Sequence, residues 1–187
     1  MFLFIIIIVV IQRLVELLIA NRNAKWMKAQ GGIEIGASHY KYIVFLHISF
    51  FISLLIEGLR TTSEMTSWWW IPFILFVIAQ IGRVWSLSSL GKYWNTRIII
   101  LPGAKVVAKG PYRFMRHPNY VIVATEIIVL PIMFQAYVTA IVFTILNAII
   151  LSIRIREEEN GLRSLTDYEK VFENRFRFIP FLRGLRR

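Results

Sequence analysis

Long apolar runs separated by short polar segments dominate the hydropathy pattern of this chain. A helix needs about 20 consecutive apolar residues to cross the hydrocarbon of a bilayer. The runs predict five membrane helices, which cover residues 2–20, 40–59, 69–90, 119–134 and 137–156. The sequence therefore predicts an all-α integral membrane protein in which residues 1–187 form a single domain.

The fourth and fifth runs are separated only by Gln135 and Ala136, which leaves room for a tight turn. The fourth run has about 16 residues, which is short for a full crossing. The helices over 119–134 and 137–156 are therefore predicted to pair as a hairpin that stops short of the far membrane surface.

The polar segments are predicted to be a connection over 21–39, a loop over 91–118 and a C-terminal segment over 157–187. Short β-branched pieces on either side of Pro102 and Gly103 favour a small hairpin or an extended loop. Pro118 suits the first position of the helix that follows it. A short helix is expected near residues 167–172.

Several charged side chains interrupt the apolar runs. Arg13 and Glu16 are three residues apart and share a helix face, so they can pair with each other or face the interior of a bundle. Arg83 is expected to face the cytosolic part of that bundle. His47 is interpreted as a satisfied structural side chain, because nothing near it completes a metal-ligand set.

Composition agrees with a membrane protein. Of all residues 57% are hydrophobic and the mean hydropathy is +0.60, whereas a soluble domain is about 45–50% apolar. The formal net charge is +11. Because the basic residues flank apolar runs, membrane lipids explain this charge and no nucleic acid partner is predicted. The chain has no cysteine, which excludes thiolate sites, and no metal is expected.

Most Lys and Arg residues lie in the segments 21–39, 91–118 and 157–187. Positively charged loops stay in the cytosol, so these three segments are predicted to share the cytosolic side. The N-terminus is then outside and the C-terminus inside. The first run lacks the features of a cleaved secretory signal and is expected to remain as a span.

The first polar cluster, residues 109–120, is rich in aromatic, basic and turn-forming residues. Backbone N–H groups at the start of the helix after Pro118 attract anions. Tyr112, His117 and Tyr120 offer stacking surfaces and hydrogen bonds. A nucleotide, a phospholipid head group or S-adenosylmethionine would use such parts. Turn chemistry before a helix explains the same residues without any ligand.

The second cluster, residues 154–159, falls at the predicted end of the fifth helix. Arg154 and Glu158 are four residues apart and share a face. Carboxylates at a helix C-terminus oppose the helix dipole, and Arg before Glu is the less favourable order. Helix stability therefore does not explain the arrangement, whereas a solvated charged helix end is an alternative.

Together the two clusters resemble the signatures of the isoprenylcysteine carboxyl methyltransferase family. Residues 110–120 are similar to its Gly-x-Tyr-x-x-x-Arg-His-Pro-x-Tyr motif, and residues 154–162 are similar to its Arg-Ile-x-x-Glu-Glu-x-x-Leu motif. Residues 178–180 are also similar to its ending. The resemblance covers roughly residues 80–182 and implies a multi-span enzyme that binds S-adenosylmethionine on its cytosolic side.

Carried over position by position, this resemblance implies specific site residues. Arg154 and Glu158 would be catalytic, with Arg154 facing the methyl acceptor. The cofactor-binding residues would be Lys105, Val106, Val107, Tyr112, His117, Pro118, Tyr120 and Glu158.

The implied reaction moves a methyl group to a carboxylate, phenol or enol oxygen of a lipophilic small molecule that enters from the bilayer. Isoprenylcysteine-like and alkyl-polyketide molecules are examples. The small size and five-span layout look like bacterial members, which implies the bacterial plasma membrane. Two alternatives stay open: a phospholipid or amine N-methyltransferase, and a non-catalytic membrane binding protein of the same fold.

Overall fold

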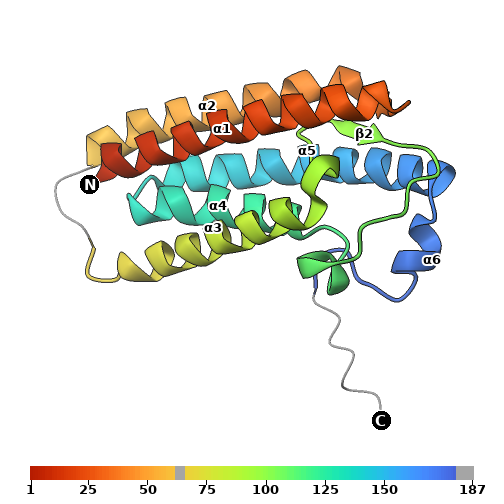
Figure 1. The fold of residues 1–187 in the computed structure, drawn as a ribbon. Coiled ribbons are helices and arrows are strands. Elements are labelled where there is room, and N and C mark those ends of the chain that lie inside the picture. Colours follow the sequence, from red (N-terminus) through yellow and green to blue (C-terminus); the bar gives the residue numbers. More distant parts are fainter. Residues whose placement is uncertain (62–65, 180–187) are drawn as a thin grey trace, which may run out of the picture.

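The computed structural model describes residues 1–61 and 66–179. Within these residues, five long helices lie side by side, and the short elements gather at one end of the bundle (Figure 1). The long helices are α1 (Phe2–Ala29), α2 (Ala37–Thr61), α3 (Trp70–Leu90), α4 (Pro118–Met133) and α5 (Tyr137–Leu165). The short elements are β1 (Ile33–Ile35), the 3-10 turn η1 (Gly91–Tyr93), β2 (Ile98–Ile100), the 3-10 turn η2 (Gly110–Arg113) and α6 (Tyr168–Phe172).

The predicted all-α membrane protein is confirmed by the length and composition of the helices. Among the described residues, α1, α2, α5 and α3 with its following turn are long and apolar enough to span a membrane, whereas α4 is a shorter apolar helix. The tight turn between α4 and α5 also forms. Gln135 takes a positive φ of 57°, and Ala136 N–H donates to the Pro131 carbonyl at 2.9 Å.

Two helices continue well beyond the apolar runs that predicted them. Residues 21–29 belong to α1 and not to a connection, and α5 runs nine residues past residue 156, to Leu165. The second cluster, 154–159, is therefore inside a helix and not at its end, which corrects the sequence interpretation. Both extensions bury a face against the short elements, with Asn23 and Met27 on α1 and Glu159 on α5. Packing thus keeps these polar stretches helical.

Of the two structures predicted around Pro102, the local hairpin does not form, and residues 101–109 are a loop instead. Strand β2 pairs antiparallel with β1, from the connection between α1 and α2, and not with the segment after Pro102. The three isoleucines of β2 are all buried. Their burial stabilises the pairing of β2 with the distant strand β1. The carboxylate of Glu34 joins the two strands to α1, because it accepts hydrogen bonds from Lys28 and Arg97. The Lys28 and Arg97 hydrogen bonds hold the pKa of Glu34 below its usual value.

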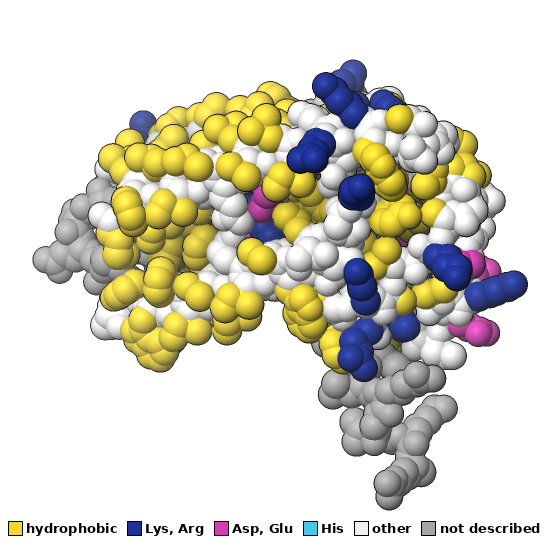
Figure 2. Space-filling model, in the orientation of Figure 1, with side chains coloured by type: hydrophobic (Ala, Val, Ile, Leu, Met, Phe, Trp, Pro, Cys, Tyr) yellow, Lys and Arg dark blue, Asp and Glu magenta, His cyan; other side chains and the backbone are white. Residues whose placement is uncertain are grey.

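A hydrophobic core fills the half of the bundle near the N-terminus. It contains Phe2, Phe50, Leu54, Leu130 and Phe134, from α1, α2, α4 and the turn after α4. The Phe2 and Phe134 rings meet edge to face with centroids 4.7 Å apart. The outer surface of this half is also apolar (Figure 2), as lipid contact requires.

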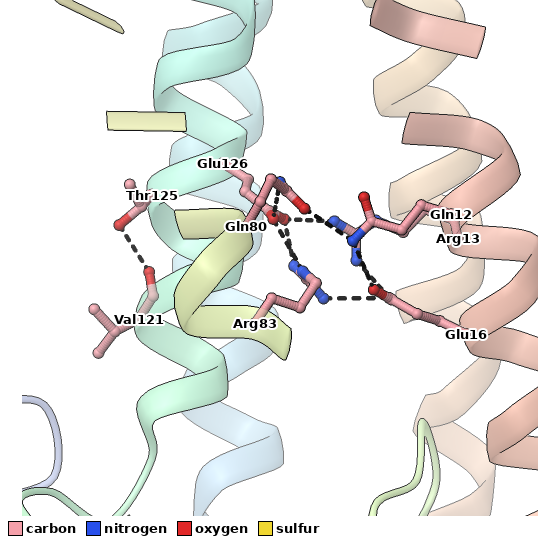
Figure 3. A network of polar contacts seen from close by, with 8 residues as sticks. All are labelled: Gln12, Arg13, Glu16, Gln80, Arg83, Val121, Thr125 and Glu126. Carbon is pink, nitrogen blue, oxygen red and sulfur yellow. Dashed lines mark hydrogen bonds and ion pairs between the residues drawn. The ribbon is translucent and has the colours of Figure 1, made fainter. Parts of the chain in front are cut away.

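A network of charged and amide side chains crosses the middle of the bundle (Figure 3). Glu126 on α4 accepts hydrogen bonds from Arg13, Gln80 and Arg83, and Glu16 on α1 accepts from Arg13 and Arg83. The predicted pairing of Arg13 with Glu16 is confirmed. Arg83, which is only 3% exposed, joins both carboxylates. The network links α1, α3 and α4 and contains two positive and two negative charges.

Lys and Arg side chains gather at the end of the bundle that carries β2 and α6 (Figure 2). The N-terminus lies at the opposite end (Figure 1). This distribution agrees with the predicted orientation, in which the basic end faces the cytosol.

Candidate active site

A pocket lies at the basic end of the bundle, between α1, β2, the turns η1 and η2, and the facing ends of α4, α5 and α6. It holds about 1050 Å³ of space free of atoms, its open mouth included. One part of the lining is apolar, including Met27, Leu90 and the three isoleucines of β2, and another part is polar and charged. A pocket of this kind suits a ligand with an oily and a polar portion.

The first sequence cluster folds into one wall of this pocket. Gly110 has a φ of 57°, and a Cβ there would collide with the side chain of Ser89, so glycine is required at the start of η2. His117 precedes α4 as its N-cap residue, and Pro118 occupies the first turn, as the sequence predicts. The cluster therefore delivers Tyr112, His117 and Tyr120 to the pocket beside a helix N-terminus.

Tyr120 joins the two predicted catalytic side chains. Its hydroxyl donates to Glu158 and accepts from Nε of Arg154, at 2.9 Å from the latter. Nη2 of Arg154 donates to the Thr96 carbonyl at 2.6 Å. Arg154 is thus held from α4 on one side and from the segment before β2 on the other. This geometry presents a fixed guanidinium to the pocket. The Tyr120 hydroxyl links this guanidinium to the carboxylate of Glu158.

His117 is held by Glu159, which the sequence analysis left unassigned. Nε2 of His117 lies 3.0 Å from Oε1 of Glu159, and Glu159 is 1% exposed. Arg177 donates to both oxygens of Glu159, at 2.9 and 2.6 Å. The hydrogen bond to Glu159 raises the pKa of Arg177. Backbone bonds from Arg116 N–H to Phe176 O and from His117 N–H to Arg177 O, each 3.0 Å long, add to this attachment.

The pocket brings together most of the side chains that the resemblance implies. Lining residues include Lys105, Val106, Val107, Tyr112, His117, Tyr120, Arg154 and Glu158. Pro118 lies outside the lining and acts by starting α4. The backbone N–H of Val106 already donates to Asp167 at 3.0 Å, which leaves its carbonyl for a ligand. Their roles toward a ligand stay predictions.

Burial raises the pKa of the lining residue Tyr112 far above its usual value, and the nearby Glu158 carboxylate raises it further. Tyr112 is therefore a neutral hydrogen-bonding group at any physiological pH and does not act as a phenolate base.

Three polar atoms of the lining have no hydrogen-bond partner among the described residues. They are Nε1 of Trp94, Nδ2 of Asn95 and Oδ1 of Asn119. Sequence reasoning missed all three residues. Trp94 and Asn95 belong to neither motif, and only a polar Trp-Asn pair between two apolar segments signals them. Buried polar atoms are nearly always paired in proteins, so three unpaired atoms in one lining are unusual.

The fold and the pocket define a helical integral membrane protein with a partly polar pocket at the basic end of its helices. A sequence model of the isoprenylcysteine carboxyl methyltransferase (ICMT) family matches residues 70–164. The chain belongs to this family and is a methyltransferase of the membrane.

Two bacterial relatives share nearly the whole chain. A Bacillus subtilis (strain 168) protein named "Uncharacterized protein YpbQ" is 47% identical over 163 residues, which are 87% of this chain and 97% of the relative. An "Uncharacterized protein" of Haemophilus influenzae is 29% identical over 156 residues, which are 82% of this chain and 90% of the relative. Both matches extend beyond the two motifs, so the similarity includes the membrane helices.

Proposed function

We propose that this protein uses S-adenosylmethionine to methylate an oxygen of a lipophilic molecule at the cytosolic face of a bacterial plasma membrane. The observation that carries the proposal is the charge of the pocket lining. Arg97, Lys105, Arg116 and Arg154 supply four cations, of which Arg97 is paired with Glu34, against the one carboxylate of Glu158 in the lining. This excess suits an acceptor with a carboxylate or an acidic hydroxyl and opposes an ammonium acceptor.

The pocket also fits the proposed cofactor. Tyr112, His117 and Tyr120 give it aromatic walls, and the positive end of the α4 helix dipole favours a carboxylate. Oδ1 of Asn119 is an unpaired acceptor on that wall, and Glu158 provides a second acceptor. These two acceptors suit the amine and hydroxyl groups of S-adenosylmethionine, which supplies a methyl group already activated by its sulfonium.

The chain's own residues contribute mainly by positioning. Arg154, held by Tyr120 and Thr96, orients the acceptor oxygen and stabilises its negative charge. S-adenosylmethionine, when bound, would supply its methyl group to this oxygen, and S-adenosylhomocysteine would leave as the second product. A carboxylate acceptor needs no base. A phenol or enol must first lose its proton, and the guanidinium of Arg154 favours that ionisation by lowering the acceptor's pKa.

The apolar lining receives the acceptor's tail. Met27 and Leu90 lie on this side of the pocket, on the ends of α1 and α3. An acceptor anchored in the bilayer reaches the charged wall with its head group while the tail stays among apolar side chains.

Replacing Glu158 with Gln tests the cofactor site. A hydrogen bond to a charged group contributes about 1.5–3 kcal/mol, so binding of S-adenosylhomocysteine should weaken about ten- to hundredfold. Titration calorimetry in detergent measures the Kd. Glu157→Gln is the matched control, since Glu157 lies in the same cluster but outside the pocket lining. Equal Kd values in the two variants would refute the assignment of Glu158.

Methyl-labelled S-adenosylmethionine, incubated with the purified protein and a bacterial lipid extract, identifies the acceptor atom. We expect label in an alkali-labile ester or in an ether. Label in an amine would instead support N-methylation, and binding without any label would support a non-catalytic binding protein.

A further inference from the structure

The segment between η1 and β2 forms part of the pocket wall and has no assigned role. Trp94 is 4% exposed, and its indole N–H has no hydrogen-bond partner among the described residues. The same holds for the buried amide nitrogen of Asn95. Both residues line the pocket. A buried donor without an acceptor is costly unless a ligand supplies that acceptor.

Hydrogen bonds anchor the backbone of this segment on both sides. Nδ2 of Asn23, on α1, donates to the Trp94 carbonyl at 2.8 Å and to the Gly91 carbonyl at 3.2 Å. On the other side, the Thr96 carbonyl accepts from Arg154 at 2.6 Å. The peptide that carries the donors therefore also holds the guanidinium that faces the methyl acceptor.

The identity of both donor atoms follows from chemistry. An indole nitrogen can only donate. Oδ1 of Asn95 accepts from the backbone N–H of Arg97 at 3.1 Å, so the opposite atom of this amide must be the NH₂ group. Neither atom can pair with an ammonium group. Each requires an acceptor such as an oxygen.

We propose that Trp94 and Asn95, together with Arg154, form a binding site for the oxyanion of the methyl acceptor. The inference rests on the proposed methyl transfer and names two residues that select its substrate. Three donor residues in the lining of one pocket favour a carboxylate or a phenolate over an amine, because an amine would leave the donors unpaired beside a cation. The indole N–H and the amide bind one part of the acceptor while Met27 and Leu90 hold its apolar part.

Nuclear magnetic resonance of the indole N–H groups tests this site without requiring turnover. The protein is labelled with ¹⁵N-tryptophan in detergent, and Trp94→Phe identifies the Trp94 signal among the six tryptophans. The probes are N-acetyl-S-farnesyl-cysteine, which has a carboxylate but no ammonium group, a long-chain alkylphenol and a long-chain primary amine. Each is added before and after S-adenosylhomocysteine.

We expect the Trp94 indole proton to shift downfield with the acid or the phenol and to stay in place with the amine. A shift caused by S-adenosylhomocysteine alone, with none from the acid or phenol, would assign Trp94 to the cofactor and overturn the proposal. A signal that no probe moves would overturn it as well. Calorimetry with S-adenosylhomocysteine reports separately on the proposed function, which fails if the cofactor product does not bind.

Two substitutions separate acceptor binding from cofactor binding. Trp94→Phe removes one N–H, and Asn95→Asp keeps the oxygen that Arg97 uses while placing a negative charge where the donor was. The affinity for the acid probe, followed by titration against the protein's amide spectrum, should fall at least about tenfold in Asn95→Asp and less in Trp94→Phe. The Kd of S-adenosylhomocysteine should stay within about threefold of the wild-type value in both.

Trp85→Phe is the matched control, because Trp85 lies outside the pocket lining and should leave both affinities unchanged. A loss of cofactor affinity in Trp94→Phe and Asn95→Asp, with unchanged acid binding, would contradict the proposed site.

Discussion

Glu159 shows how one side chain outside the pocket lining can order the site. It is buried and binds His117, which lines the pocket, while Arg177 covers both of its oxygens. An ionised carboxylate only accepts hydrogen bonds, so Nε2 of His117 carries a proton toward Glu159. The imidazole is thereby fixed in one orientation against the start of α4.

Substituting Arg177 tests this positioning role without touching the pocket. Arg177→Met leaves Glu159 with fewer partners, so His117 should lose its fixed orientation and S-adenosylhomocysteine should bind about three- to tenfold more weakly. Arg177→Lys, which keeps one charged donor, should recover part of the affinity. Calorimetry compares both with Arg163→Met, since Arg163 contacts the same carboxylate only at 3.5 Å. Wild-type affinity in Arg177→Met would rule out the role.

Sequence motifs identify site residues that stand at fixed spacings in the chain. They miss residues that come together only when the chain folds. Tyr120, Arg154 and Glu158 stand in recognisable patterns. Glu159 also stands in a motif, but its partner Arg177 comes from beyond α6. Trp94 and Asn95 stand in none. A buried donor without a partner among the described residues has no signature in a linear sequence.

Among the elements, α1 depends on polar contacts inside the bundle. Its outer face is apolar and exposed, as with Phe4 and Leu18, while Arg13 and Glu16 tie it to α3 and α4 (Figure 3). Charges in a membrane interior are tolerated only when they are paired. These four charged side chains therefore fix the position of α1 against α3 and α4.

Removing one charge from this network should destabilise the protein strongly. Arg83→Met leaves Glu16 and Glu126 to share the single cation of Arg13, and breaking a buried pair costs about 3–5 kcal/mol. Thermal unfolding in detergent measures the effect, with Arg22→Met as an exposed control on α1. The double variant Arg83→Met/Glu126→Leu should recover part of the loss, because it restores charge balance. A single variant as stable as the control would show that the network does not stabilise the fold.

The elements themselves were largely predictable, and their ends were not. Hydropathy located all five long helices because the bilayer demands long apolar runs. It could not reveal that α1 and α5 continue into polar sequence, since packing against the pocket segments maintains those turns. The pairing of β1 with β2 joins segments about 65 residues apart, and no local pattern specifies such a partner.

On the scale of the whole molecule, charge divides the protein into two ends. The basic end carries the pocket, and the far end is closed by an aromatic core. The N-terminus lies at the far end (Figure 1). In the predicted orientation, the pocket would be reached by soluble molecules of the cytosol and by lipids of the inner leaflet.

The absence of native cysteine makes this orientation directly testable. Single cysteines at Trp70 and Lys109, both exposed positions, should react oppositely with a membrane-impermeant maleimide added to intact bacterial cells. Trp70→Cys should be labelled from outside, whereas Lys109→Cys should be labelled only after the membrane is opened. Labelling of Lys109→Cys in intact cells would reverse the predicted topology.

The attachment of residues 176–177 to residues 116–117 has a consequence for the life of the chain in the cell. Synthesis proceeds from the N-terminus, and helices enter the membrane in order as they emerge. His117 is made and placed long before Arg177 leaves the ribosome, so its wall of the pocket is finished last. A chain that stalls or is cut before residue 176 would hold all five helices but an unfinished site. Ligand binding would therefore require that translation has passed residue 177.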